Sequence, residues 1–147
     1  MNVLVATLIS GGPWDPALTS LLLVQGACLY FFGMALNDRL DVKRDRENAA
    51  NGLQPPRPLV SGEISLKTAD RLIALSLLGA LVMAAGIYLM KGEAAGEGLL
   101  FSAGTLGCIL LYNCAFKFVP FLGPLCMGLV RGMLIFSSSI LCSGSFP

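Results

Sequence analysis

The chain has 147 residues, of which 55% are hydrophobic and only 13% are charged, and its formal net charge is +1. About a quarter of the residues in an average soluble domain are charged, and a small domain cannot hide this much apolar surface from water, so the composition indicates a membrane protein. The sequence contains no histidine, which excludes histidine metal sites and Ser-His-Asp or Cys-His catalysis.

Two elements are expected at the N-terminus. Residues 1–10 are apolar but too short to cross a bilayer, and the Gly-Gly-Pro sequence at 11–13 predicts a turn, so we expect residues 1–10 to be the remnant of a helix. Residues 17–36 follow without a charge. A helix of this length, rising about 1.5 Å per residue, crosses roughly 30 Å of hydrocarbon. We therefore predict a first complete span at residues 17–36.

Three further apolar runs predict the remaining spans. Only the last of them contains a charged residue, Arg131. We therefore predict an all-α fold, a multi-spanning transmembrane helix bundle with four spans and a partial first helix, as one domain over residues 1–147. The three runs are residues 72–90, 99–116 and 121–142.

The five cysteines lie in apolar runs and form no Cys-x-x-Cys pair. Such positions are typical of small packing residues in helices, and they argue against a disulfide framework or a zinc site. The five are Cys28, Cys108, Cys114, Cys126 and Cys142.

The loop between the first and second spans carries most of the positive charge. Seven Lys and Arg residues lie between residues 37 and 71, whereas the next loop contains only Lys91. Because Lys and Arg are enriched on the cytoplasmic side of membrane proteins, we expect an integral, multi-pass protein with this loop in the cytoplasm. Lys117, in the third loop, then faces the same side.

An acidic motif follows the first span directly. If the helix continues past Leu36 at about 100° per residue, Asp38, Asp41 and Asp45 all lie within about 100° of Asn37, on one face. Most of the neighbouring basic residues fall on the opposite face. The charges are therefore sorted by sign instead of being interleaved.

One interpretation of this motif is a solvated helix end with salt bridges. However, Asp38–Asp41 and Asp41–Asp45 are like-charge neighbours at i,i+3 and i,i+4, and each pair is unfavourable by about 0.2–0.5 kcal/mol. A helix selected only for stability would interleave the signs. We therefore favour a bound cation that relieves the repulsion.

Magnesium fits this set of side chains. Mg²⁺ prefers hard oxygen ligands and is usually held by one or two carboxylates together with substrate phosphates. Neither the spacing of an EF-hand nor a glycine-rich phosphate loop is present. Arg57, which lies between prolines, could clamp phosphate oxygens, although positive-inside topology also explains it. The sequence thus predicts a Mg²⁺ site that takes a phosphate-bearing substrate.

These residues resemble the UbiA-type intramembrane prenyltransferases. The family's first signature, N-D-x-x-D-x-x-x-D, is matched by Asn37, Asp38, Asp41 and Asp45. Its R-P-[IL]-x-S-G-x-[IV]-S element is matched by residues 57–65, and its Tyr-then-Lys pattern is similar to Tyr112 and Lys117.

The resemblance implies an all-helical membrane enzyme that transfers a polyprenyl group from an isoprenyl diphosphate to a hydrophobic or aromatic acceptor, of which aromatic, tetrapyrrole and lipid molecules are the alternatives. Arg57 and Lys117 would contact the diphosphate. The expected partners are these substrates and the lipid bilayer, and no nucleic acid. The catalytic and Mg²⁺-binding residues would be Asp38, Asp41 and Asp45, with Asn37 as a further ligand of metal and substrate.

The sequence departs from the family pattern in its second half. Family members have more helices and a second Asp-rich loop, whereas this sequence contains no aspartate after Asp70. We therefore expect this chain to be the half with the first motif and to be inactive alone. A second half or C-terminal segment that carries the second motif is the expected partner. A fragment, a split half and a decayed copy are each compatible with the sequence.

Two further residues are candidate substrate contacts. Arg131 lies within the last span, where a charge is costly and usually faces a cavity or a partner. A substrate contact, a buried structural pair and a position nearer the interface remain open for it. Tyr112 lies near the cytoplasmic end of its span, where interfacial anchoring is the alternative.

Two other functions remain open. The chain could be a non-catalytic membrane fragment or subunit that retains the motif. It could also belong to an enzyme that transfers phosphoribosyl to a polyprenyl phosphate, which would use a similar metal site.

Overall fold

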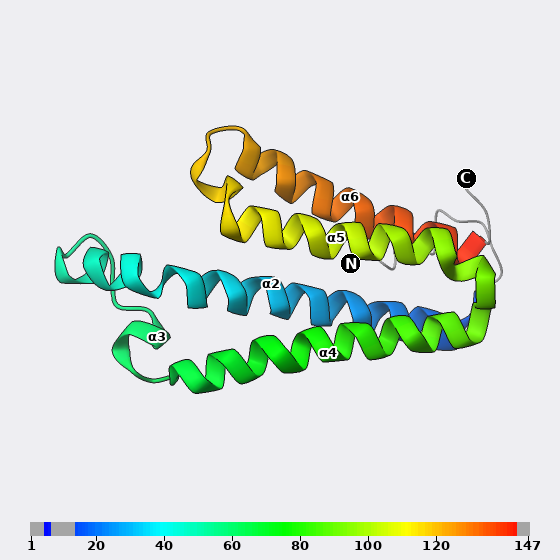
Figure 1. Ribbon diagram of the computed structural model, residues 1–147, viewed down its shortest axis with the longest axis horizontal. Helices are drawn as coiled ribbons and strands as arrows, with labels where there is room; N and C mark the ends of the chain where they lie inside the picture. Colours follow the sequence, from blue (N-terminus) through cyan, green and yellow to red (C-terminus); the bar gives the residue numbers. More distant parts are fainter. Residues whose placement is uncertain (1–4, 7–13, 144–147) are drawn as a thin grey trace.

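The computed structural model describes residues 5–6 and 14–143. Within these residues the chain is helical and contains no strand, which confirms the predicted all-α class. Four long helices are joined by short helical connections (Figure 1). In chain order the elements are α2 (Pro16–Ala50), α3 (Pro58–Ser61), α4 (Leu66–Lys91), η1 (Gly92–Ala95), α5 (Gly96–Cys114), η2 (Phe116–Phe118) and α6 (Leu122–Ser143).

The four long helices form two antiparallel hairpins. α2 packs along α4, α5 packs along α6, and the two hairpins touch mainly through α2 and α5 (Figure 1). η1 turns the chain from α4 into α5 at one end of the molecule. The C-terminal part of α2, the short helix α3 and the α5–α6 connection all lie at the other end (Figure 1).

α2 extends well beyond the predicted span at residues 17–36, because it runs from Pro16 to Ala50. Asp15 caps it, because its Oδ1 accepts hydrogen bonds from the N–H of Ala17 at 2.9 Å and from the next residue at 3.1 Å. Pro16 then occupies the first helical position, where its fixed φ suits a helix. The helix continues without interruption past Leu36 to Ala50 and carries the whole acidic motif.

The other helix boundaries differ by a few residues from the apolar runs. α4 begins at Leu66, before the predicted span, because Ser65 caps it with an Oγ that accepts from the N–H of Thr68 at 3.1 Å. It ends at Lys91 and is followed by Gly92, whose φ of 61° is readily available only to glycine. α5 ends at Cys114, so the last two residues of the predicted span belong to the connection.

The expected N-terminal helix remnant falls largely outside the described residues. Among residues 1–13 only Val5 and Ala6 are described, and both are helical. The extent of this element and the turn after it therefore stay predictions.

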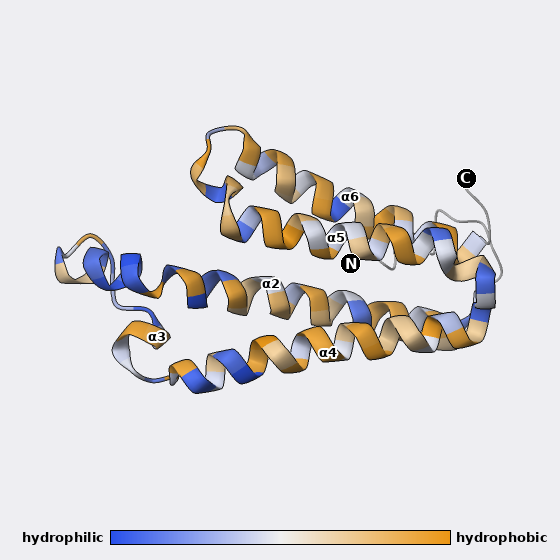
Figure 2. Cartoon of the chain, in the orientation of Figure 1, coloured by the Kyte–Doolittle hydropathy of each residue, from blue (hydrophilic) through white to orange (hydrophobic). Residues whose placement is uncertain are grey.

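Three helical stretches are long and apolar enough to cross a membrane: Pro16–Ala50, Leu66–Cys114 and Leu122–Ser143. The second contains both α4 and α5, which η1 folds back on each other. Only 11% of the most apolar 18-residue segment of this stretch is buried inside the protein, so most of the surface of that segment faces outward. Apolar residues cover the lengths of the helices, while hydrophilic residues gather at the helix ends (Figure 2). This distribution is that of an integral membrane bundle.

Two apolar clusters hold the bundle together. A Cβ at Gly33 would lie 3.1 Å from Cγ2 of Ile109, so glycine allows α2 and α5 to approach closely beside the second cluster. The first cluster lies near η1 and contains Leu18, Leu22, Ile87, Ala95 and Leu141. The second lies nearer the motif and contains Leu29, Phe32, Ala80 and Ile109.

Candidate functional site

The motif residues lie on the part of α2 that extends beyond the apolar run. Asp41 and Asp45 are buried, with exposed fractions of 4% and 3%, whereas 45% of the Asp38 side chain is exposed. A buried carboxylate is costly unless it is paired or hydrogen-bonded. The partners of Asp41 and Asp45 therefore determine what this end of the molecule can bind.

Two cations hold the two oxygens of Asp41. Nζ of Lys117 lies 2.6 Å from Oδ1, and Nη2 of Arg44 lies 3.2 Å from Oδ2. Lys117 also donates to Oδ1 of Asn37 at 3.5 Å. The α5–α6 connection delivers Lys117 to α2 from 76 residues along the chain, and its side chain is only 6% exposed. The Lys117–Asp41 ion pair is therefore buried between the two hairpins.

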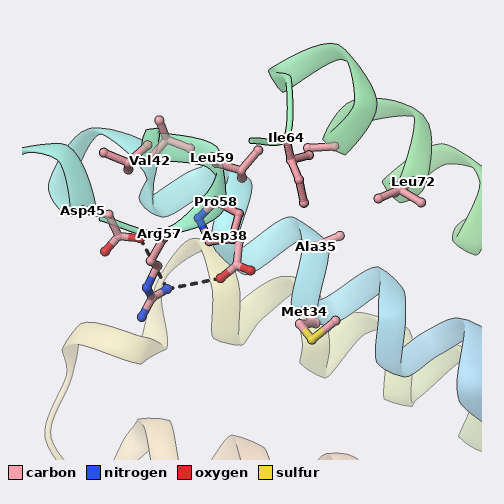
Figure 3. Close-up of a pocket in the computed structure, with 12 residues that line it drawn as sticks. Met34, Ala35, Asp38, Val42, Asp45, Arg57, Pro58, Leu59, Ile64 and Leu72 are labelled. Atoms are coloured by element: carbon pink, nitrogen blue, oxygen red, sulfur yellow. Dashed lines mark hydrogen bonds and ion pairs between the residues drawn. The ribbon is translucent and has the colours of Figure 1, made fainter. Parts of the chain in front are cut away.

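Arg57 joins the other two aspartates. Its Nη1 lies 3.2 Å from Oδ1 of Asp38 and 3.3 Å from Oδ2 of Asp45 (Figure 3). Nε2 of Gln54 donates to the other oxygen of Asp45 at 3.1 Å. Arg57 is the N-cap of α3 and has an extended backbone, as expected for the residue before Pro58. The loop after α2 thus folds back over the motif.

A small pocket lies beside Arg57, between α2, α3 and the start of α4 (Figure 3). Its walls are mostly apolar, and Asp38, Asp45 and Arg57 supply its charged groups. Its volume is about 140 Å³. Typical ligand pockets have volumes of roughly 300–1,000 Å³, so this pocket alone does not define a substrate site.

Phe118 contacts both cations that hold Asp41. Cζ of Arg44 lies 4.9 Å from the centroid of its ring, and Nζ of Lys117 lies 5.1 Å from it. Cations at such distances are attracted by the ring quadrupole. The aromatic ring therefore helps to orient two positive charges toward one carboxylate.

The structure adds ion pairs to the acidic face of α2. The like charges predict a metal that relieves their repulsion, and each aspartate of the motif is also paired with a cation in the described part of the chain. One of these cations, Arg44, lies at the edge of the acidic face and pairs at i,i+3, and the others come from distant segments. On the opposite face, Nε of Arg39 lies 2.7 Å from Oδ1 of Asp70 on α4. Salt bridges therefore contribute at this helix end.

The donors fit magnesium by their chemistry, since they are carboxylate and amide oxygens on one helix face. Among the residues that the structure describes, however, no three acidic or cysteine side chains are close enough together to hold a metal ion. Lys117 and Arg57 contact the oxygens that would be metal ligands. A metal site here therefore requires these carboxylates to exchange partners.

The other two candidate residues are not brought into this cluster. Tyr112 is half-buried, and its ring lies beside Gly123 at the start of α6, where a Cβ would be 3.8 Å from Cε2. Arg131 is exposed on α6 and forms no hydrogen bond or ion pair with any described residue. Their roles as substrate contacts stay predictions.

Sequence reasoning missed three residues of the cluster. Arg44 had a detectable signal, because it lies at i,i+3 from Asp41 on a predicted helix. Gln54 and Phe118 lie in connections between helices, where no periodicity assigns a direction to a side chain.

Comparisons with known proteins agree with this architecture. The model of the UbiA prenyltransferase family matches residues 1–147. The apo structure of a UbiA homolog from Aeropyrum pernix K1 is similar, with a TM-score of 0.76 and 31% sequence identity, over 97% of this chain and 48% of that one. The chain thus spans about half the length of that relative, and a search of curated proteins found no match. By the match over its whole length, the chain belongs to the UbiA prenyltransferase family.

Proposed function

We propose that the protein transfers a polyprenyl group from an isoprenyl diphosphate to a hydrophobic or aromatic acceptor in the membrane, with Mg²⁺ as cofactor. This chain would supply one metal- and diphosphate-binding half of the site. The observation that best supports the proposal is the convergence of three segments at one end of an apolar bundle: the motif on α2, Arg57 before α3, and Lys117 in η2. Carboxylates flanked by cations suit a metal-bound anion, and an apolar bundle suits an isoprenoid chain.

Each polar residue of the cluster has a role in this proposal. Arg57 would donate to diphosphate oxygens with its planar guanidinium, and Lys117 would add a compact positive charge. Bound Mg²⁺ would neutralise the charge that develops on the diphosphate as it leaves. The metal ligands would be Asn37, Asp38, Asp41 and Asp45.

The proposed site faces the cytoplasm. Seven of the ten Lys and Arg residues lie between residues 37 and 71, in the segment that carries the motif, and such enrichment is typical of the cytoplasmic side. The apolar length of the helices supports a position of the isoprenoid chain in the bilayer, beneath the diphosphate.

Completion of the site would require further acidic groups. The family resemblance implies a second Asp-rich loop, and the sequence contains no aspartate after Asp70. We propose that another segment or a partner chain supplies this loop. Tyr112 and Arg131 would contact substrate from the side that this segment covers.

A non-catalytic membrane subunit is the second candidate. The observation that favours it is that every aspartate of the motif is already neutralised by a cation in the described part of the chain. A structural role predicts that the motif stabilises the protein without binding a diphosphate.

Transfer of radiolabel from an isoprenyl diphosphate to a panel of acceptors tests the proposal. In the full-length protein with Mg²⁺, we expect Asp41→Asn to lower product formation at least about 100-fold, since removal of one preorganised group that stabilises developing charge costs this much. The matched control is Asp70→Asn, because Asp70 lies on α4 and pairs with Arg39 outside the motif. Full activity of Asp41→Asn, or of enzyme treated with chelator, contradicts the proposal. A labelled phosphoribosyl donor, assayed in parallel, identifies the related reaction.

A further inference from the structure

We propose that Lys117 takes the place of a metal ion beside Asp41. Its ammonium pairs with the Asp41 carboxylate in the ligand-free protein and leaves it when a divalent metal and a diphosphate bind together. The inference rests on the proposed function and deepens it. It assigns Lys117 two successive partners, first the Asp41 carboxylate and then the diphosphate.

The buried pair is the first observation behind this inference. Lys117 and Asp41 have side-chain exposures of 6% and 5%, and Nζ lies 2.6 Å from Oδ1. A buried carboxylate that has no partner is strongly destabilising, so a cation at Oδ1 stabilises Asp41 in addition to Arg44 at Oδ2. Lys117 provides it from a connection 76 residues away.

The second observation is that both oxygens of Asp41 are engaged. Lys117 contacts Oδ1, and Arg44 lies 3.2 Å from Oδ2. Lys117 also contacts the amide oxygen of Asn37, the neighbouring candidate ligand, at 3.5 Å. An ammonium and a divalent ion cannot both lie beside Oδ1 of Asp41 and Oδ1 of Asn37. Lys117 and a metal therefore compete for these two oxygens.

The third observation is that the Lys117 ammonium can move away from Asp41 without leaving this carboxylate unpaired. Its side chain is a flexible stem with a compact charge, whereas Arg44 on α2 can remain at Oδ2 and keep Asp41 paired. The ring of Phe118, which is 59% exposed, lies 5.1 Å from Nζ. The ring would guide the ammonium as it moves from the carboxylate to an anionic ligand.

This competition couples two binding events. Metal alone must displace Lys117 and leave a buried ammonium without its partner. A diphosphate that arrives with the metal gives the ammonium a new anionic partner. The protein should therefore bind a divalent metal weakly alone and much more tightly with a diphosphate, a reciprocal coupling.

Mn²⁺ binding, measured by electron paramagnetic resonance with and without inorganic pyrophosphate, tests the inference in the purified full-length protein. Removal of the competing ammonium in Lys117→Met should strengthen binding of Mn²⁺ alone about 5–150-fold, the usual range of coupling between two sites. The enhancement of Mn²⁺ affinity by pyrophosphate should shrink in the same variant. Lys43→Met is the matched control, because Lys43 is exposed on α2, two residues from Asp41, and should bind Mn²⁺ as the wild type does.

Lys117→Gln keeps the test valid if the methionine variant does not fold. Its amide can still donate a hydrogen bond to Asp41, and we expect the same direction of change. Unchanged or weaker binding of Mn²⁺ alone in the folded Lys117 variants overturns the inference. Absence of any pyrophosphate-assisted Mn²⁺ binding in the wild type overturns the proposed function instead, so the two failures are distinguishable.

Discussion

At the scale of single residues, Arg57 organises the outer part of the motif. Its Nη1 lies within 3.3 Å of an oxygen of both Asp38 and Asp45, so one guanidinium offsets two negative charges. Gln54 holds the remaining oxygen of Asp45. Because 46% of the Arg57 side chain is exposed, it can also reach an anion that approaches from outside the bundle.

Replacement of Arg57 by alanine should weaken binding of an isoprenyl diphosphate in the presence of Mg²⁺ about 10–100-fold. The reason is that a hydrogen bond to a charged group contributes about 1.5–3 kcal/mol. Equilibrium binding of a labelled diphosphate to the full-length protein measures the change. Arg71→Ala is the control, because Arg71 is an exposed basic residue near the start of α4, at the same end of the bundle. Equal losses of diphosphate affinity in the two variants would mean that Arg57 acts only as one of the positive charges that orient the protein in the membrane.

Part of the cluster could be predicted from the sequence. The helical spacing of Asp38, Asp41 and Asp45 places them near one another without any tertiary information. The pairing of Lys117 with Asp41 could not be predicted from local pattern, because it depends on how the second hairpin docks on the first. The like charges on one helix predict a metal, and the sequence offers Arg57 and Lys117 as contacts of a diphosphate but not as partners of the aspartates.

At the scale of helices, the α5–α6 hairpin depends on small and polar residues at its interface. Oγ of Ser137 donates to the carbonyl of Gly98 at 2.8 Å and lies 2.8 Å from Oγ of Ser102. A Cβ at Gly98 would collide with the side chain of Leu141. Small residues allow such close approach between membrane helices, and interhelical hydrogen bonds stabilise it.

Gly98→Ala should therefore lower the free energy of unfolding by about 1–3 kcal/mol, the usual cost of overpacking. The matched control is Gly107→Ala on the same helix, because a Cβ there meets no atom of the described chain within 4 Å. The control should be neutral or slightly stabilising, since alanine favours a helix over glycine. Unfolding of both variants in detergent provides the comparison. A Gly98 variant as stable as the Gly107 variant would mean that the helices can separate at no cost.

The helix boundaries show what apolar runs can and cannot predict. Hydrophobic length located the apolar part of each long helix. It could not locate the ends of α2 and α4, because Asp15 and Ser65 set the starts through side-chain caps, and α2 continues through a charged segment to Ala50. Hydropathy marks where an apolar run stops, but it marks neither a cap nor the continuation of a helix through charged residues.

At the scale of the whole molecule, the two hairpins meet through few contacts. Besides the Lys117–Asp41 pair, Nδ2 of Asn113 donates to the carbonyl of Gly33 at 3.5 Å. Oδ1 of the same amide is buried and has no hydrogen-bond partner among the residues that the structure describes. These polar contacts join the hairpins toward the charged end of the bundle, while the apolar cluster that contains Leu18 and Leu141 joins them near η1, so changes at the site should affect docking at the charged end.

The orientation of the bundle gives a prediction at this scale. Asn51 lies in the connection after α2, and Glu93 lies in η1 at the opposite end. In a cysteine-free background, Asn51→Cys should react with a membrane-impermeant maleimide only from the cytoplasmic side, and Glu93→Cys only from the other side. The expectation follows from the enrichment of Lys and Arg around the motif. The reverse pattern of labelling would invert the bundle and place the aspartates outside the cytoplasm.

The central claim is that the carboxylates on α2 bind an isoprenyl diphosphate through Mg²⁺. Its most direct test is a titration of the full-length protein with a labelled isoprenyl diphosphate, with Mg²⁺ and with chelator. We predict saturable binding that requires Mg²⁺ and is lost in Asp41→Asn, while Asp70→Asn binds as the wild type does. Binding that is equally strong in chelator, or unaffected by Asp41→Asn, would contradict the account.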